Sequence, residues 1–148
     1  WFGKSKEKYS QADVYFKISE CYLQINIYKS TNRSEATKKE YLALCDLLKQ
    51  LSNDLIAESD NDFKLMIWKE VSRMIHSEVK DFYLCGGDEK MEEILTSIEN
   101  QLKDFEASSN EGKGLYPEQK QDVDSILDFV GQTRKKIENL KQADNNLM

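Results

Sequence analysis

His76 is the only histidine of the chain, and it limits the chemistry that the sequence offers. No glutamate lies three residues before or after it. A di-metal centre in a helical bundle needs such Glu-x-x-His pairs, so we expect no metal site of that kind. A triad that includes His76 would depend on residues brought together by the fold. We interpret His76 as a partly exposed structural histidine.

The three cysteines, Cys21, Cys45 and Cys85, show no Cys-x-x-Cys spacing. Each lies within or at the end of an apolar helical pattern, which is typical of small buried side chains. Acidic residues follow Cys85, and they do not favour a reactive thiolate. We expect reduced thiols, which favours a reducing compartment, although an exported protein can also carry free or paired thiols.

Gly86 and Gly87 form the only Gly-Gly pair and directly follow Cys85. A phosphate-binding loop of the GxxxxGK[ST] type needs a longer glycine spacing than this. The alternative is a boundary between helices, in which one glycine takes the left-handed conformation that ends a helix and Asp88 caps the next helix. We favour this alternative and predict that Gly86, Gly87 and Asp88 form a structural hinge.

Two acidic clusters resemble cation sites only in part. The stretch Asp60-Asn61-Asp62 begins like a calcium loop, but Lys64 stands where an oxygen ligand is needed and no glycine follows at the sixth position. Glu89, Glu92 and Glu93 fall in the first turns of a predicted helix, where carboxylates complement the helix dipole. We therefore expect helix caps and a solvated face here, with no metal and no cofactor.

Apolar residues recur at three- and four-residue spacing in five segments, and none keeps a β-type alternation. Short connections between long helices place consecutive helices antiparallel. We predict an all-α fold, an up-and-down antiparallel bundle of four to five long helices in a single domain, residues 1–148. The spacing predicts helices at about 10–29, 34–58, 62–84, 88–107 and 117–141.

Three segments lie outside these helices. Residues 107–116 are rich in Ser, Gly and Asn and are predicted as a mobile loop, and residues 142–148 as a frayed end. Residues 1–9 open with two aromatics before three lysines, an order found beside membrane segments. Because the chain begins at Trp1 rather than Met, we predict either a membrane-proximal start that follows an absent upstream anchor or a flexible polar terminus.

The charge balance limits the range of partners. The formal net charge is -6, and 39% of the residues are hydrophobic and 32% charged. This composition suits a soluble helical protein, and no apolar run approaches the roughly 18 residues of a membrane span. Basic residues are not clustered, so we expect no nucleic-acid partner.

The first helix carries more apolar residues than one buried face needs. Its predicted core side chains are Val14, Ile18, Cys21, Ile25 and Tyr28. Other faces of the same helix are apolar too, so the helix is either central in the bundle, which we favour, or covered by a partner. The same two alternatives apply to Trp68 in the third helix. We name four candidate partner-binding residues, Tyr15, Tyr22, Ile27 and Trp68.

These patterns favour a non-catalytic domain that binds another protein, as an adaptor, a secretion or effector component, or an inhibitor. The alternative is a small-ligand-binding or enzymatic bundle with a pocket lined by Tyr22, Trp68 and His76. A third possibility is a homo-oligomer formed through the heptad face of the helix at 117–141, which includes Val130 and Ile137.

Overall fold

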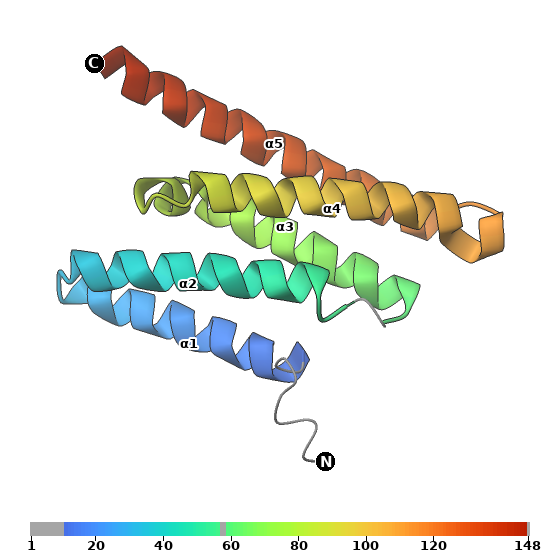
Figure 1. The fold of residues 1–148 in the computed structure, drawn as a ribbon, viewed down its shortest axis with the longest axis horizontal. Coiled ribbons are helices and arrows are strands. Elements are labelled where there is room, and N and C mark those ends of the chain that lie inside the picture. Colours follow the sequence, from blue (N-terminus) through green and yellow to red (C-terminus); the bar gives the residue numbers. More distant parts are fainter. Residues whose placement is uncertain (1–10, 57–58, 148) are drawn as a thin grey trace.

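The computed structural model describes residues 11–56 and 59–147, and this part of the chain contains helices and no strand (Figure 1). The all-α prediction is confirmed. The start of the chain at residues 1–9, predicted as flexible or membrane-proximal, lies outside the described residues. The helices are α1 (Gln11–Ser30), α2 (Ser34–Asn53), α3 (Asn61–Leu84), α4 (Asp88–Ser108), the short 3₁₀ helix η2 (Ser109–Gly112) and α5 (Pro117–Leu147).

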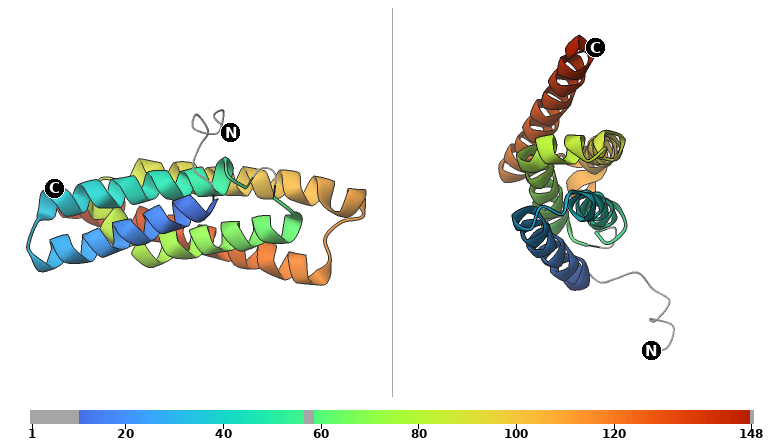
Figure 2. Two further views of the ribbon diagram at one scale, coloured as in Figure 1. Left: turned by 90° about the horizontal axis from the view of Figure 1, so that it is seen from below. Right: turned by 90° about the vertical axis from the view of Figure 1, so that its left-hand side faces the viewer.

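Consecutive long helices run in opposite directions, as expected for an up-and-down bundle (Figure 1). They form two layers, with α1, α3 and α5 in one and α2 and α4 in the other (Figure 2). The most extensive contacts are those of α1 with α2 and of α3 with α5. α2 also packs against α3 and α4, which places α1 at one edge of the bundle.

Buried side chains from all five long helices form one hydrophobic cluster. In α5 the buried set recurs at three- and four-residue spacing, so one stripe of the helix faces the core. Val130 and Ile137, which we considered as part of a possible dimer interface, belong to this stripe and are 1% exposed each. This face is buried within its own chain, mainly against α3, and self-association through it stays a possibility that the structure does not test.

The turn between α1 and α2 is built differently from the capping box that Asn32 and Glu35 suggest. Asn32 has a left-handed φ of 58° and follows the end of α1. The Arg33 amide donates to the Tyr28 carbonyl at 2.8 Å and the Asn32 amide to the Lys29 carbonyl at 3.3 Å, a pattern that closes a helix C-terminus. Arg33, not Asn32, is therefore the N-cap residue of α2.

At the turn between α3 and α4, Gly86 takes the left-handed conformation, with φ 83°. The Gly87 amide donates to the Phe82 carbonyl at 2.8 Å, which completes the C-terminal motif of α3. Gly87 is the N-cap position of α4, so Asp88 is the first helical residue rather than the cap. The Asp88 carboxylate instead lies 4.0 Å from Lys141 of α5.

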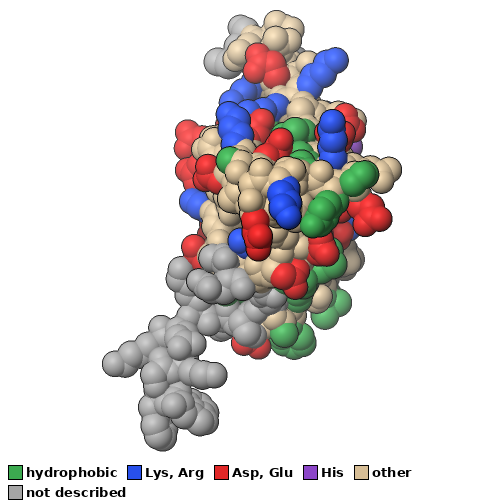
Figure 3. All heavy atoms as spheres, turned by 90° about the vertical axis from the view of Figure 1, so that its right-hand side faces the viewer, with side chains coloured by type: hydrophobic (Ala, Val, Ile, Leu, Met, Phe, Trp, Pro, Cys, Tyr) green, Lys and Arg blue, Asp and Glu red, His purple; other side chains and the backbone are tan. Residues whose placement is uncertain are grey.

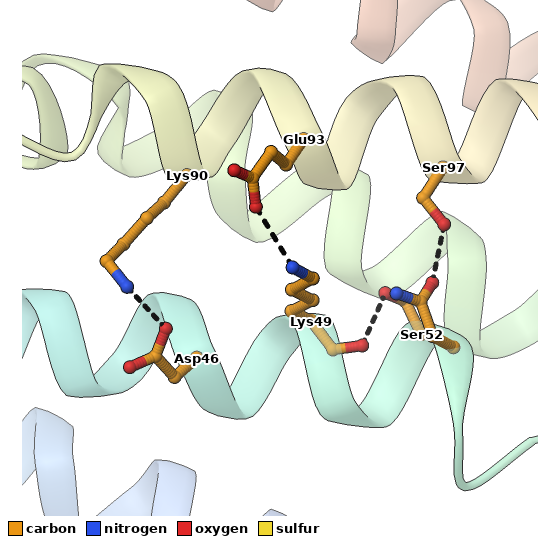
Figure 4. A network of polar contacts seen from close by, with 7 residues as sticks. Asp46, Lys49, Ser52, Lys90, Glu93 and Ser97 are labelled. Carbon is orange, nitrogen blue, oxygen red and sulfur yellow. Dashed lines mark hydrogen bonds and ion pairs between the residues drawn. The ribbon is translucent and has the colours of Figure 1, made fainter.

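α2 ends at Asn53, five residues before the predicted end, and side chains from two other helices donate to one carbonyl of its last turn. The Ser52 carbonyl accepts from the Trp68 indole at 3.0 Å and from the Gln101 amide at 3.1 Å. The Asn53 side chain accepts from the Ser97 hydroxyl at 2.7 Å, beside the Lys90–Asp46 and Lys49–Glu93 ion pairs that join α2 to α4 (Figure 4). Asp60 then caps α3 by accepting from the Phe63 amide at 2.8 Å.

The segment predicted as a mobile loop, 107–116, is cross-linked by hydrogen bonds. η2 occupies its centre. The side-chain amide of Asn110 donates to the side-chain oxygen of the buried Gln119 at 2.9 Å. The same Gln119 oxygen accepts from the Tyr116 amide at 3.0 Å. α5 then continues to Leu147, beyond the predicted end at 141, and its last turns diverge from the other helices (Figure 1).

Candidate functional site

The outer face of α1 exposes three large apolar side chains to solvent. Phe16 is 64% exposed, Leu23 58% and Ile27 43%. Spacings of seven and four residues place them on one stripe of an α-helix. At 100° per residue this stripe lies opposite the buried Val14 and Ile18. We call these three residues the outer α1 face.

α1 is therefore not the central helix that the sequence led us to favour. It lies at the edge of its layer, with α2 as its principal neighbour (Figure 2). Only one stripe of α1 is buried in the core. Hydrophobic side chains gather over the α1 and α3 side of the molecule, toward the lower right of the view in Figure 3.

Tyr15 and Tyr22, two of the predicted partner-binding residues, are half-buried and pack against the core. Burial, together with the nearby Glu78 carboxylate of α3, raises the pKa of Tyr22 to about 12. Burial likewise raises the pKa of Tyr15, together with Glu70 of α3. Both rings therefore lie along the side of α1 that faces α3, at the margin of the exposed stripe and not at its centre.

Ile27 is the one predicted partner-binding residue that is largely exposed, and Phe16 and Leu23 were missed. The signal was present in the sequence. Once Val14 and Ile18 are assigned to the core, helical geometry places residues 16, 23 and 27 about 180° away from them. Tyr15 and Tyr22 were predicted instead because tyrosine is enriched at interfaces.

Trp68, also named as a candidate partner-binding residue, is buried, with 3% of its surface exposed, and so takes the core alternative of the two that we considered. Its indole N–H donates to the Ser52 carbonyl. Its ring meets Phe105 of α4 edge to face, with 5.7 Å between ring centroids. Trp68 is a core residue, because its ring is packed and its N–H is hydrogen-bonded inside the bundle.

His76 lies between α3 and α5, half-buried, with its ring centroid 5.6 Å from that of Phe129. Burial lowers the pKa of His76, and the positive charge of Lys136 lowers it further. Its Nε2 atom is buried and has no hydrogen-bond partner in the described part of the chain. At neutral pH the imidazole is therefore uncharged.

The structure does not bring Tyr22, Trp68 and His76 into one pocket. Tyr22 lies near Glu78 and Arg73, and His76 lies near Phe129 and Lys136. Trp68 borders a cavity of about 290 Å³ that opens between α2, α3 and α4 and is also lined by Phe105 and Gln101. The three side chains thus have separate neighbours, and no site is assembled from them.

A charged cluster that we did not predict joins α1 to α3. Lys29 of α1 pairs with Asp81 of α3 at 3.5 Å, and its ammonium lies 5.2 Å from the centre of the Tyr41 ring. Glu78 sits beside them at a non-helical point inside α3, with φ -110° and ψ 15°. Burial and the neighbouring Asp81 raise the pKa of Glu78. The cluster fixes the edge of α1 against α3.

The thiols are not activated. Burial raises the pKa of Cys45 to about 12 and that of Cys21 to about 11. Burial also raises the pKa of Cys85, which is half-buried at the end of α3. All three are free cysteines, and at neutral pH they are held as thiols, which are poor nucleophiles.

Two further properties concern the described residues alone. Within 11–56 and 59–147, histidine, cysteine, aspartate and glutamate side chains nowhere gather in a group of three or more that could hold a metal ion. In the same ranges, no helix combines the length and the apolar character needed to cross a bilayer.

Comparison of the chain with protein-family models, with curated proteins and with solved structures gives no match. The functional interpretation of the outer α1 face therefore rests on the geometry of this structure.

Proposed function

We propose that this protein is a helical interaction domain that binds another protein through the outer α1 face. The observation that carries the proposal is the exposure of Phe16, Leu23 and Ile27 on one stripe of a helix whose opposite stripe already completes the core. Single exposed apolar residues are ordinary, but an aligned set on one helix marks an interaction surface.

The geometry of the face indicates the kind of partner. Eleven residues separate Phe16 from Ile27, so the three side chains extend over about 16 Å of helix. Anchors at this spacing fit a partner that offers an apolar groove or the apolar stripe of its own helix. Ser19 and Glu20, both exposed, border the stripe and would form part of a polar rim.

The core does not require these side chains. α1 buries Val14, Ile18, Cys21 and Ile25 in the core, packs mainly against α2, and forms the Lys29–Asp81 ion pair with α3. Removing the outer stripe therefore leaves the contacts that hold the helix in place. Binding and folding can be separated by mutation.

The test compares the wild type with the triple variant F16S/L23S/I27S. A partner is first isolated on immobilised wild type, and its Kd for both proteins is then measured by calorimetry. We expect at least a 100-fold loss of affinity, because three central apolar anchors are removed. L127S is the matched control, because Leu127 is 41% exposed on α5, and it should bind as the wild type does.

Thermal unfolding of the free proteins shows whether a variant has lost only the binding surface or has lost the folded structure. The triple variant should unfold cooperatively, with a Tm close to that of the wild type. The proposal is wrong if the triple variant retains the affinity of the wild type. It is also wrong if screens on immobilised wild type yield no protein partner.

A further inference from the structure

A cavity of about 640 Å³ lies at the end of the bundle where the α1–α2 turn approaches the α3–α4 turn. This end faces the viewer in the right-hand view of Figure 2. A volume of this size is in the range of sites that hold small organic ligands, about 300 to 1,000 Å³. Its walls are of two kinds, cationic (Lys29, Arg33, Lys38) and apolar (Tyr28, Leu84, Cys85).

The cationic wall stands out because the whole chain carries a net charge of -6. Three basic side chains line the cavity against one carboxylate, that of Glu35. Lys29 is already paired with Asp81 at 3.5 Å. Arg33 and Lys38 form no ion pair with any described residue, so their charges are available to a ligand. A guanidinium fork binds carboxylate or phosphate in a bidentate manner.

The apolar wall gives the cavity a second type of contact. Leu84 is 68% exposed, the largest exposed fraction among the large hydrophobic side chains of the described residues. Cys85 and Tyr28 beside it are half-buried. An exposed leucine next to unpaired cations suits a ligand that has an anionic end and an apolar body.

We propose that this cavity binds a small organic anion, in which a carboxylate or phosphate group contacts Arg33 and Lys38 and an apolar portion contacts Leu84. Lys29, held by Asp81 and lying over the Tyr41 ring, forms the fixed rim of the site. The site is separate from the outer α1 face, so the ligand proposal and the protein-binding proposal can be refuted independently.

Hexanoate and acetate are the first two probes, titrated into isotopically labelled protein at constant ionic strength. Saturable shifts in the backbone amide NMR signals of residues 33–38 and 84–85 are expected with hexanoate. Hexanoate should bind about tenfold more tightly than acetate, because its additional methylenes contact the apolar wall. Inorganic phosphate is the third probe. Tighter binding of phosphate than of acetate would identify a phosphate ester as the ligand class, and the reverse a carboxylate.

Three variants locate the site. R33Q/K38Q should weaken hexanoate at least tenfold, whereas K69Q, which removes a cation elsewhere on α3, should leave its affinity unchanged. L84A should reduce the preference for hexanoate over acetate and leave the affinity for acetate unchanged. Shifts that grow linearly without saturation, or equal affinities of R33Q/K38Q and the wild type, would overturn the proposal. All the substituted side chains are exposed or half-buried, and an unchanged Tm verifies the fold.

Discussion

α1 and α5 are both long helices at the outside of the bundle, yet they distribute their apolar residues differently. In α5 the buried stripe includes Val123, Ile126, Val130 and Ile137, and the opposite face is almost entirely polar, with Leu127 as its exposed large apolar side chain. α1 buries an equivalent stripe and exposes a second one opposite it. Because α5 shows that an edge helix needs only one apolar stripe to fold, the second stripe of α1 calls for another purpose.

The largest effect should come from placing a charge on the buried stripe of α5. V130D puts a carboxylate at a position that is 1% exposed, inside the hydrophobic cluster. We expect destabilisation by more than about 4 kcal/mol, enough to unfold many domains of this size. Circular dichroism at 25 °C measures the loss of helix. L127D on the outer face of the same helix should remain folded, and a folded V130D would contradict the assigned stripe.

The two stripes of α1 can be compared with the same substitution in the same helix. I18A removes a side chain that is 3% exposed, and should cost about 2–5 kcal/mol in urea unfolding. I27A removes one that is 43% exposed and should cost less than about 1 kcal/mol. Similar costs for both substitutions would mean that the outer stripe is part of the core.

Two glycines test the backbone at a turn and on the polar face of α5. Gly86 has a φ of 83°, so G86A should destabilise by about 1–2 kcal/mol. Gly131 is helical, and a Cβ added there meets nothing within 4 Å, so G131A should stabilise by about 0.5–1 kcal/mol. Opposite signs in the same denaturation assay are expected, and a stabilising G86A would refute the left-handed hinge.

The smallest effect concerns the charged edge between α1 and α3. The pKa of Glu78 is raised in the folded protein, so the folded state binds this proton more tightly than the unfolded state does. Stability should therefore fall as the pH rises from the unfolded pKa of about 4.5 through the raised folded pKa. E78Q should remove this decline and gain less than about 1 kcal/mol at pH 7. Unfolding curves at pH 4 and pH 7 measure the difference, and a larger decline in E78Q than in the wild type would contradict the assignment.

The helices could be predicted from the sequence because their apolar spacing is regular over four to six turns, as in α3 and α5. The end of α2 could not, since Trp68 and Gln101, which donate to the Ser52 carbonyl in its last turn, are distant in the sequence. The role of Asn32 cannot be read from the sequence for a related reason. Asparagine suits both an N-cap and a left-handed C-terminal position, and only the backbone path decides between them.

The candidate surface was predicted only in part. The excess of apolar residues in α1 is visible in the sequence, but which of them are exposed depends on whether the helix is central or at an edge. The position of α1 depends on how α2 and α3 pack against it. The apolar spacing within α1 does not contain that information. Trp68 was left with two alternatives, core or partner-facing, because neither its contact with Phe105 nor its bond to Ser52 can be read from local spacing.

The central claim, that the outer α1 face binds another protein, is tested most directly by site-specific photo-cross-linking. A photo-reactive amino acid replaces Leu23 in one sample and Leu127 in another, and each is irradiated in an extract of the source organism. We predict a discrete product with a second protein from position 23 and not from position 127. Unlabelled wild type should compete for it and F16S/L23S/I27S should not. Identical products from both positions, or equal competition by the triple variant, would contradict the account.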